Sequence, residues 1–263
     1  MTFFVYFFID LYGEVLFFKK SIYLQSVDST NIYLKKCEKE DRIVVWTYNQ
    51  TAGRGRENRK WIDFKDKNLA LSVLFEPTEP FNINWYIAAT SLSLIDTLDY
   101  YGIRERWIKW PNDVYINGKK LAGILAESVW NGNRIDRLII GIGINVNTEK
   151  EEIALIDKKA TSVAIEKGSK IDIKEWTERF IQNLSYRFEI LLEQNRIDKI
   201  KEDWLKESKI IGKKVEWIDI NKNVREGIVE DIDNDGFLVL KIGNDIIKVM
   251  SGDIALKDFY KNK

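Results

Sequence analysis

The stretch Lys109–Ser128, KWPNDVYINGKKLAGILAES, places two strand-forming runs on either side of the dipeptide Asn117-Gly118. Asn-Gly is the dipeptide that most favours a tight type I′ turn, so the stretch predicts a β-hairpin. Ahead of the hairpin, Pro111 disfavours the helical conformation at Trp110 and holds it extended. The centre of the chain is therefore predicted to be antiparallel sheet.

Two lysines, Lys119 and Lys120, follow the predicted turn. Side chains alternate between the two faces of a strand, so one of these lysines is expected to face the covered side of the sheet. A buried ammonium group needs a partner, and a bound anion would serve. Two solvated hairpin lysines are the alternative if this segment is taken alone.

The flanking segments alternate between strand-like and helix-like patterns, which predicts a mixed α and β unit. A second turn signal at 131–133 extends the hairpin into a meander from Arg106 to Asn147. The expected helices are 29–40, 82–101 and 171–194, and the expected strands outside the meander are 42–47 and 68–75. The fold class is α+β, with a mixed, largely antiparallel sheet.

After Ser208 the sequence pattern changes to short strand-like segments separated by turns, which predicts a small β-barrel. The expected domains are therefore 1–207, a large domain that binds the ligands, and 208–263, the barrel. The helix at 171–194, with Asp172 as its N-terminal cap, closes the large domain.

Composition narrows the function classes. The 263 residues hold 41 Lys plus Arg and 41 Asp plus Glu, so the net charge is zero, which weighs against a dedicated DNA-binding protein. The single Cys37 excludes an intramolecular disulfide and a cysteine metal cluster, and it fits a reducing cytoplasm. Histidine is absent, so acid–base work falls to carboxylates, lysines or substrate groups.

The N-terminal run MTFFVYFFID is apolar but much shorter than the roughly 20 residues that a membrane span needs. It has neither the basic region nor the cleavage site of a signal peptide. We expect residues 1–20 to form strand, with a membrane-associated segment as the lesser alternative. A start codon assigned too early is a further alternative.

The stretch Asn49–Trp61, NQTAGRGRENRKW, is a cationic loop without an apolar run. Gly53 and Gly55 allow backbone N–H groups to approach a ligand closely, and the arginines of this loop suit phosphate or carboxylate. No Walker or dinucleotide motif is present. From these residues alone, a solvated turn is as good an interpretation as an anion-binding loop, and a nucleic-acid arm is a weaker one.

Four segments, in order, resemble the biotin protein ligases: SVDSTN at 26–31, QTAGRGRENRKW at 50–61, KWPNDVYINGKKLAGIL at 109–125 and GIGINVN at 141–147. The resemblance spans about residues 22–258. It implies a class II synthetase-like catalytic domain followed by an SH3-like barrel. It also implies ATP-dependent formation of biotinyl-5′-AMP, and then transfer of biotin to a lysine of a biotin carboxyl carrier protein.

The resemblance also implies roles for residues that match its motifs. Lys120 and Arg56 would be the catalytic cations. The biotin site would comprise Ser29, Thr30, Asn31, Gln50, Gly53, Arg54, Gly55, Arg56, Lys120 and Gly123. The ATP site would comprise Arg56, Arg59, Trp61, Asn112, Lys120 and Asn145. Trp61 as a core anchor and Asn145 as a turn residue are the alternatives, and Asp113 is left out because an Asp after Asn often only caps a turn.

Mg²⁺ is expected to accompany ATP, near Asn112 and Asn145, without a protein ligand that can be assigned. The family also suggests a homodimer, and the expected partners include neither DNA nor a membrane. The rival functions are a lipoate protein ligase, a biotin-sensing repressor and an inactive binding module. Only about 25 residues precede SVDSTN, too few for a three-helix DNA-binding domain.

One position departs from the family pattern: Asn58 stands where the family usually has glycine. Asn is the residue other than glycine that best tolerates the left-handed backbone region, so the turn is expected to survive. We interpret 49–61 as a flap that closes over the adenylate and excludes water, and Asn58 is expected to affect its motion.

Overall fold

The computed structural model describes residues 3–6, 17–38, 40–77, 82–156 and 159–256. Its large sheet has the strand order β1-β2-β3-β4-β8-β7-β6-β5, in which β2 pairs with β3 in parallel and the other neighbours pair antiparallel. The strands are β1 (Phe3–Tyr6), β2 (Lys20–Leu24), β3 (Ile43–Thr47), β4 (Asn68–Phe75), β5 (Arg106–Lys109), β6 (Asp113–Ile116), β7 (Lys119–Asn131) and β8 (Arg134–Asn145). The predicted mixed, largely antiparallel sheet is confirmed.

The hairpin that the sequence predicted joins β6 to β7. Both of its turn residues have positive φ, 48° at Asn117 and 71° at Gly118, as a type I′ turn requires. Gly132, with φ 60°, leads from β7 into β8. The peptide bond before Pro111 is cis, a conformation open to proline that the sequence analysis did not predict.

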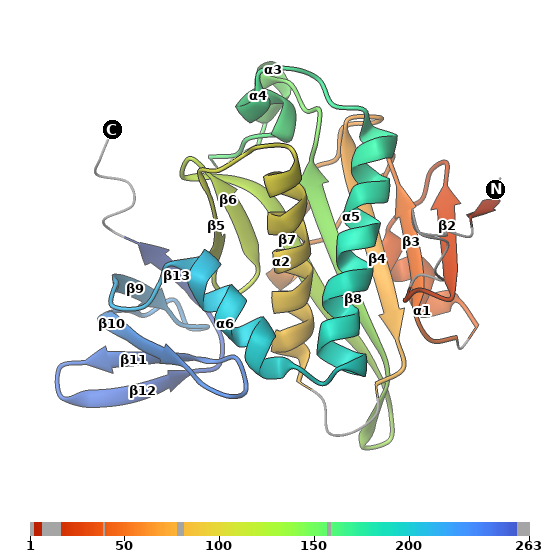
Figure 1. The fold of residues 1–263 in the computed structure, drawn as a ribbon. Helices are drawn as coiled ribbons and strands as arrows, with labels where there is room; N and C mark the ends of the chain where they lie inside the picture. The colour runs from red at the N-terminus through yellow and green to blue at the C-terminus, as the bar shows by residue number, and fades with distance from the viewer. Residues whose placement is uncertain (1–2, 7–16, 39, 78–81, 157–158, 257–263) are drawn as a thin grey trace.

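Helices cover one face of this sheet. Figure 1 shows α2 (Ile83–Tyr100) and α5 (Ile173–Phe188) in front of it, with α6 (Ile197–Ser208) beside them. Helix α2 starts after Asn82, whose side chain accepts the N–H of Asn84, and is followed by Gly102 at φ 76°. Helix α5 gives way to a π-helical turn (Glu189–Glu193), so the helix predicted over 171–194 has two parts.

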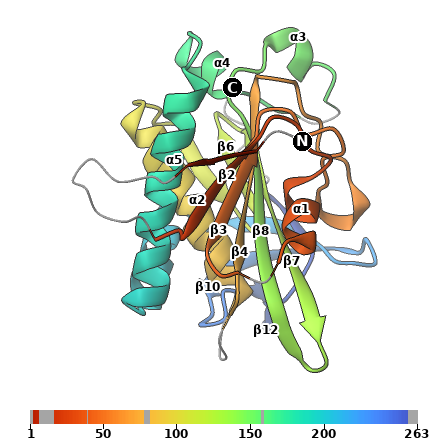
Figure 2. The ribbon, with the colours of Figure 1, turned by 90° about the vertical axis from the view of Figure 1, so that its right-hand side faces the viewer.

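The opposite face is covered only in part. Figure 2 shows α1 (Thr30–Lys36) on the side of the sheet away from α2 and α5. It seals a small second core that includes Leu34 and Leu74. The short helices α3 (Lys150–Ile153) and α4 (Val163–Lys167) lie beyond the end of β8. Between α1 and the β6–β7 hairpin the sheet keeps an uncovered area, and the functional residues gather there.

A second, antiparallel sheet follows α6, in the order β12-β11-β10-β9-β13. Its strands are β9 (Lys214–Ile218), β10 (Val224–Ile232), β11 (Leu238–Ile242), β12 (Asp245–Val249) and β13 (Asp253–Leu256). The indole N–H of Trp85, on α2, donates to the carbonyl of Asn234 at 2.9 Å and ties this sheet to the large domain. The boundary predicted between residues 207 and 208 stays a prediction; α6 ends at Ser208.

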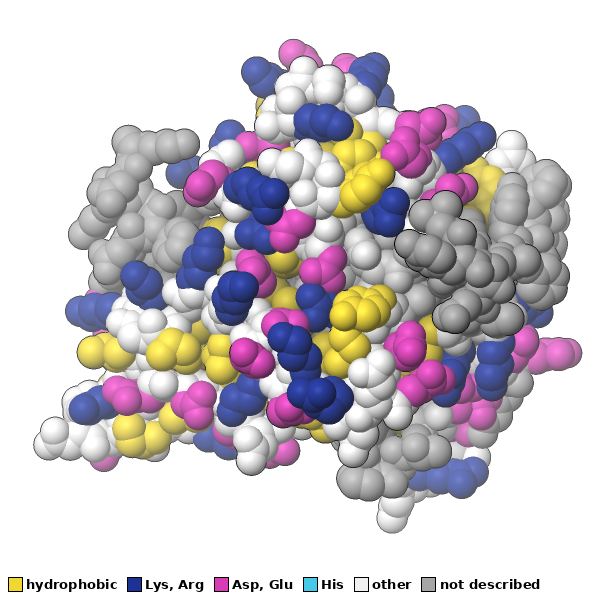
Figure 3. All heavy atoms as spheres, viewed as in Figure 1, with side chains coloured by type: hydrophobic (Ala, Val, Ile, Leu, Met, Phe, Trp, Pro, Cys, Tyr) yellow, Lys and Arg dark blue, Asp and Glu magenta, His cyan; other side chains and the backbone are white. Residues whose placement is uncertain are grey.

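The N-terminal expectation is met where the structure describes it. Phe3–Tyr6 forms β1, antiparallel to β2, whereas residues 1–2 and 7–16 lie outside the described residues. Within the described ranges, none of the helices has both the length and the apolar character needed to cross a membrane. Lys, Arg, Asp and Glu side chains intermingle over the face shown in Figure 3, in keeping with the zero net charge.

Arg187 joins three helices and generates a stability prediction. Its guanidinium on α5 donates to Asp96 on α2 at 2.6 and 2.8 Å and to Asp203 on α6 at 2.6 Å. Arg187→Leu would remove the cation that Asp96 binds and would leave Asp203 with Lys199 alone, at 2.8 Å. We expect a loss of about 3 kcal/mol in the free energy of unfolding, measured by urea denaturation. The control Arg196→Leu removes an exposed pair with Asp198 and should lower the free energy of unfolding much less. Equal losses in the two variants would contradict this account.

Candidate functional site

The uncovered area of the sheet is a floor of small residues on three adjacent strands. In the register, Ala70 on β4 lies opposite Gly143 on β8, Ser72 lies opposite Gly141, and Gly143 lies opposite Gly123 on β7. A Cβ atom added to Gly141 would collide with the Asn31 carboxamide, and one added to Gly143 would collide with the Trp61 indole. These two glycines therefore let the Asn31 and Trp61 side chains pack directly on the floor.

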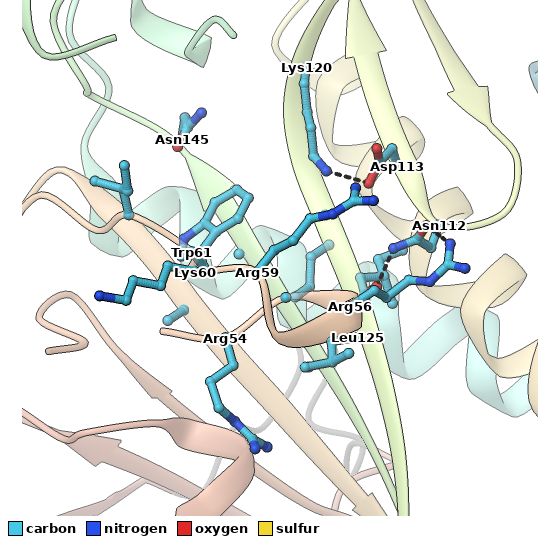
Figure 4. A pocket seen from close by; sticks show the side chains of 18 of the residues that line it. Arg54, Arg56, Arg59, Lys60, Trp61, Asn112, Asp113, Lys120, Leu125 and Asn145 are labelled. Carbon is cyan, nitrogen blue, oxygen red and sulfur yellow. Dashed lines mark hydrogen bonds and ion pairs between the residues drawn. The ribbon is translucent and has the colours of Figure 1, made fainter. Parts of the chain in front are cut away.

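Above this floor lies a cavity of about 530 Å³, a size typical of small-molecule sites. Figure 4 shows side chains converging on it from the loop 49–61, the β6–β7 hairpin and β8. Every residue predicted to bind a ligand lines the cavity except Gly53. A Cβ atom on Gly53 would lie 2.6 Å from the Trp61 carbonyl and 2.9 Å from Gln50 Nε2, so Gly53 packs inside the loop.

The start of α1 forms a polar end of the cavity. Ser29 caps the helix, accepting the N–H of Ile32, and the next two residues, Thr30 and Asn31, are buried. Gln50 Oε1 accepts the backbone N–H of Thr30 at 3.0 Å. The hydroxyl of Ser72, on the floor, lies 2.6 Å from both Thr30 Oγ1 and Asn31 Oδ1. These bonds fix the direction of each polar group before a ligand arrives.

Glu127 on β7 accepts hydrogen bonds from two cationic side chains and one amide at this end of the cavity. Its carboxylate accepts hydrogen bonds from Lys35 at 2.7 Å, from Asn31 at 2.8 Å and from Arg54 at 2.6 Å to each oxygen. Burial raises the pKa of Glu127, but the hydrogen bonds from Lys35, Asn31 and Arg54 outweigh it and hold this pKa below its ordinary value. Figure 4 shows the Arg54 guanidinium pointing away from Lys120, so its predicted contact with a ligand carboxylate stays a prediction.

Lys120 reaches the cavity because of a β-bulge. The register between β6 and β7 shifts after Val114, which leaves Leu121 as an extra residue and lets Lys120 share a face with Gly123. The Lys120 ammonium lies 2.6 Å from Asp113 Oδ1. One lysine was predicted to face the covered side of the sheet with an anion as its partner. Lys120 instead faces the cavity, on the side of the sheet away from α2 and α5, and its partner there is Asp113, a residue that the sequence analysis left out.

The loop arginines meet the second sheet. Arg56 donates to Asn112 Oδ1 at 2.9 Å and to the Gly252 carbonyl at 3.3 Å. Arg59 lies 3.4 Å from Asp253 and 2.7 Å from Glu57. Asp253 thus reaches the cavity from the first position of β13. Sequence reasoning missed it because no local pattern shows which end of the small domain faces the loop.

Trp61 and Asn145 make structural contacts and also line the cavity. The Trp61 indole lies against Gly143, and its buried Nε1 has no hydrogen-bond partner among the described residues. Asn145 is buried and donates to the Thr161 carbonyl at 3.0 Å, as a structural residue at a strand end would, yet it also lines the cavity. Trp61 is thus part of the cavity wall, and its predicted contact with adenine stays a prediction.

The loop turn around Asn58 is left-handed. Glu57 has φ 55° and Asn58 has φ 59°. The expectation that Asn58 preserves the turn is therefore confirmed, because Asn adopts this region at modest cost. The Arg59 N–H donates to the Arg56 carbonyl at 3.1 Å and closes this left-handed turn.

Asp63, two residues beyond Trp61, was also missed. Its Oδ2 accepts the backbone N–H of Gln50 at 2.8 Å, while Oδ1 is buried. Burial raises the pKa of Asp63 to about 6, against the opposing influence of the Gln50 N–H, the Asn68 side chain and the Phe64 N–H. No motif marked this residue.

Gly141 and Gly143 could have been found from the sequence. They stand at alternate positions with Asn145 in GIGINVN, so on a strand all three face one side. That spacing predicts a strand face with room above it. As for metal ions, the described residues contain no group of three or more Asp, Glu, Cys or His side chains that could hold one.

Comparison with known proteins identifies relatives over most of the chain. Residues 23–145 match the Biotin/lipoate A/B protein ligase family, and residues 210–257 match the Biotin protein ligase C terminal domain. The biotin–[acetyl-CoA-carboxylase] ligase of Mycobacterium tuberculosis is 31% identical over 82% of this chain and 79% of its own length. The ligase of the same name from Paracoccus denitrificans is 31% identical over 83% of this chain and 92% of its own.

A solved structure shows the same fold. The biotin protein ligase from Aquifex aeolicus in complex with biotin and ATP superposes with a TM-score of 0.76 and is 28% identical, covering 91% of this chain and 99% of that one. The bifunctional ligase/repressor of Escherichia coli is 30% identical over 90% of this chain and 74% of its own length.

The buried carboxyl of Asp63 generates a pH prediction. A raised carboxyl pKa means that the folded protein pays to ionise the group, so its stabilising contribution is complete below the ordinary pKa of 3.8 and is lost as pH rises through about 6. Asp63→Asn removes that cost. Its free energy of unfolding relative to the unsubstituted protein should increase by about 3 kcal/mol between about pH 4 and pH 7.

Denaturant unfolding at several pH values measures this difference. Asp66→Asn is the matched control, because Asp66 is exposed in the same loop and its φ of 61° suits Asn. A pH-independent difference between Asp63→Asn and the unsubstituted protein would contradict the burial of an ionised Asp63.

Proposed function

The chain belongs to the biotin protein ligase family, and we infer that it is an ATP-dependent ligase that activates biotin as biotinyl-5′-AMP and transfers biotin to a lysine of a carrier protein. One observation carries this: a single cavity joins a fixed polar end at α1 to a group of cations at the hairpin and loop. The polar end suits the amide-like head of a ligand, and the cations suit its anionic tail and a triphosphate.

Biotin would lie along the floor with its ureido head at α1. Thr30, Asn31 and Gln50 present hydroxyl and carboxamide groups there, fixed by the bonds among themselves and to Ser72. The ring system would rest near Gly141, and the valeryl chain would carry the carboxylate toward Lys120. The glycine floor supports this placement because a ring needs close contact with the backbone.

Adenylation needs positive charge more than a general base. The biotin carboxylate oxygen attacks the α-phosphorus of ATP, and the bond to pyrophosphate breaks, so negative charge spreads over the phosphoryl oxygens. Lys120 and Arg56 are the cations proposed to stabilise it, with Arg59 toward the other phosphates. In the structure Asp113 holds Lys120, whereas Asn112 and the Gly252 carbonyl hold Arg56, so these cations are oriented in advance.

Trp61 and Asn112 are proposed to line the nucleotide side, with Asn145 at the end of the floor. In the second step the carrier lysine amine attacks the acyl carbon of the mixed anhydride, AMP leaves, and the amine loses a proton as the amide forms. The loop 49–61 would cover the adenylate and exclude water until then. Absence of histidine is compatible with both steps, because fixed cations stabilise them.

The remaining expectations belong to the same proposal. Mg²⁺ enters bound to ATP as part of the substrate. The acceptor is a biotin carboxyl carrier domain, in line with the acetyl-CoA-carboxylase named for the relatives. We expect the protein to be a cytoplasmic homodimer and not to bind DNA.

Pyrophosphate release tests the proposed function. The protein with MgATP and biotin should release pyrophosphate before any carrier is added, and a carrier domain should then become labelled with biotin. Lipoate replaces biotin in a parallel arm. Release with lipoate and none with biotin would assign the chain to the lipoate branch of the family, and release with neither would contradict adenylation.

Lys120→Ala is expected to lower the rate of biotin-dependent pyrophosphate release by about 10²- to 10³-fold, because it removes a fixed cation from the charge that develops at phosphorus. Lys119→Ala, the exposed neighbour, is the matched control and should stay within about twofold. Single-turnover kinetics with saturating biotin separates the chemical step from binding. Similar rates for the two variants would contradict the assignment of Lys120.

A further inference from the structure

Asp63 occupies the base of the loop that covers the cavity. Its Oδ2 accepts the Gln50 N–H at 2.8 Å. Gln50 precedes the glycine–arginine segment and Asp63 follows it, so this bond closes the base of the loop. Inside this closure, the Trp61 N–H donates to the Gly53 carbonyl at 3.0 Å, and the Gly55 N–H donates to the Arg59 carbonyl at 2.7 Å. The side chain of Asp63 thus fixes the point from which the loop leaves the sheet.

The same bond orients the polar end of the cavity. With its backbone held by Asp63, Gln50 turns its Oε1 to the N–H and hydroxyl of Thr30, at 3.0 and 3.3 Å. This leaves the Gln50 amide nitrogen facing Gly53, on the loop side. The direction of that N–H donor, and the position of Thr30, both depend on where the Gln50 backbone sits.

The choice of a carboxylate at this position is costly. A mostly buried acid destabilises the fold when it is ionised, and a neutral acceptor could close the same backbone bond to Gln50 at a lower cost. The bond that it makes is stronger than a neutral one, because the acceptor is charged. Asp63 thus lowers the stability of the fold but binds Gln50 more strongly than a neutral residue would. Because Gln50 lines the cavity, this exchange points to a role for Asp63 in ligand binding.

We propose that Asp63 is a positioning residue that sets the affinity for biotin by fixing Gln50 and, through it, Thr30. The inference rests on the proposed function, since it names biotin as the ligand at the α1 end. Because Asp63 acts at this end and not at Lys120, its loss should weaken biotin binding much more than ATP binding.

The test compares KM values for biotin and for ATP in biotin-dependent pyrophosphate exchange. Asp63→Ala should raise the KM for biotin about tenfold or more, as expected for losing a hydrogen bond to a charged group, with the KM for ATP within about twofold. Asp63→Asn keeps an oxygen that can accept the Gln50 N–H but lacks the charge, so it should recover only part of the loss. Asp66→Asn, exposed in the same loop, should match the unsubstituted protein.

Hydrogen exchange of the peptide that contains Gln50 gives a readout without substrate. Exchange should be faster in Asp63→Ala than in Asp63→Asn or Asp66→Asn. An unchanged biotin KM and unchanged exchange in Asp63→Ala would overturn the assignment, as would KM values for biotin and ATP that rise together. Failure of the unsubstituted protein to exchange pyrophosphate with biotin would instead contradict the proposed function.

Discussion

Close packing against a floor without side chains is the constraint on which the site depends. Gly141 admits the Asn31 carboxamide and Gly143 admits the Trp61 indole, and a methyl group at either position would occupy the same space. Asn31 comes from α1 and Trp61 comes from the loop 49–61, so the two glycines of β8 determine how both segments meet the sheet. The same strand carries the hydrogen bonds to β4 and β7 that hold the floor in place.

The cationic side chains above this floor are held in position by acidic side chains of the same chain. Lys120 is held by Asp113, Arg59 by Glu57 and Asp253, and Arg54 by Glu127. Each pair reduces the cost of gathering several positive charges in one cavity. An incoming carboxylate or phosphate competes with Asp113 and Asp253 for the nearest cations, so ligand binding and reorganisation of these pairs are coupled. Arg54 is different, because its partner also binds Lys35 and Asn31.

Local patterns in the sequence predicted much of the fold. The strand Asn68–Phe75, the Asn117-Gly118 turn and the helix between Asn82 and Gly102 each depend on residues adjacent in the chain, and all are present. Other features depend on neighbours far apart in the chain. The bulge that turns Lys120 toward the cavity arises from the register between two strands, and the contact of Asp253 with the loop arginines arises from how the small sheet sits on the large domain.

Some residues of the candidate site were also predictable from local patterns, and others were not. Residues within recognisable motifs, such as Lys120 and Asn31, were predicted and line one cavity. Asp113 was passed over because an Asp in a turn has an ordinary local role, and Asp63 because its partner, Gln50, lies across a loop. A charged side chain gives no sign in the sequence of which distant backbone N–H or ammonium group it will meet.

The most direct test of the account is a crystal structure of the protein with biotin and a non-hydrolysable ATP analogue. We expect the fused rings against the floor at Gly141, the ureido group at Thr30 and Asn31, and the biotin carboxylate beside Lys120, with the Lys120–Asp113 distance longer than the present 2.6 Å. Biotin bound outside this cavity, or lying with its carboxylate at the α1 end, would contradict the central claim that the glycine floor joins a binding end to a catalytic end.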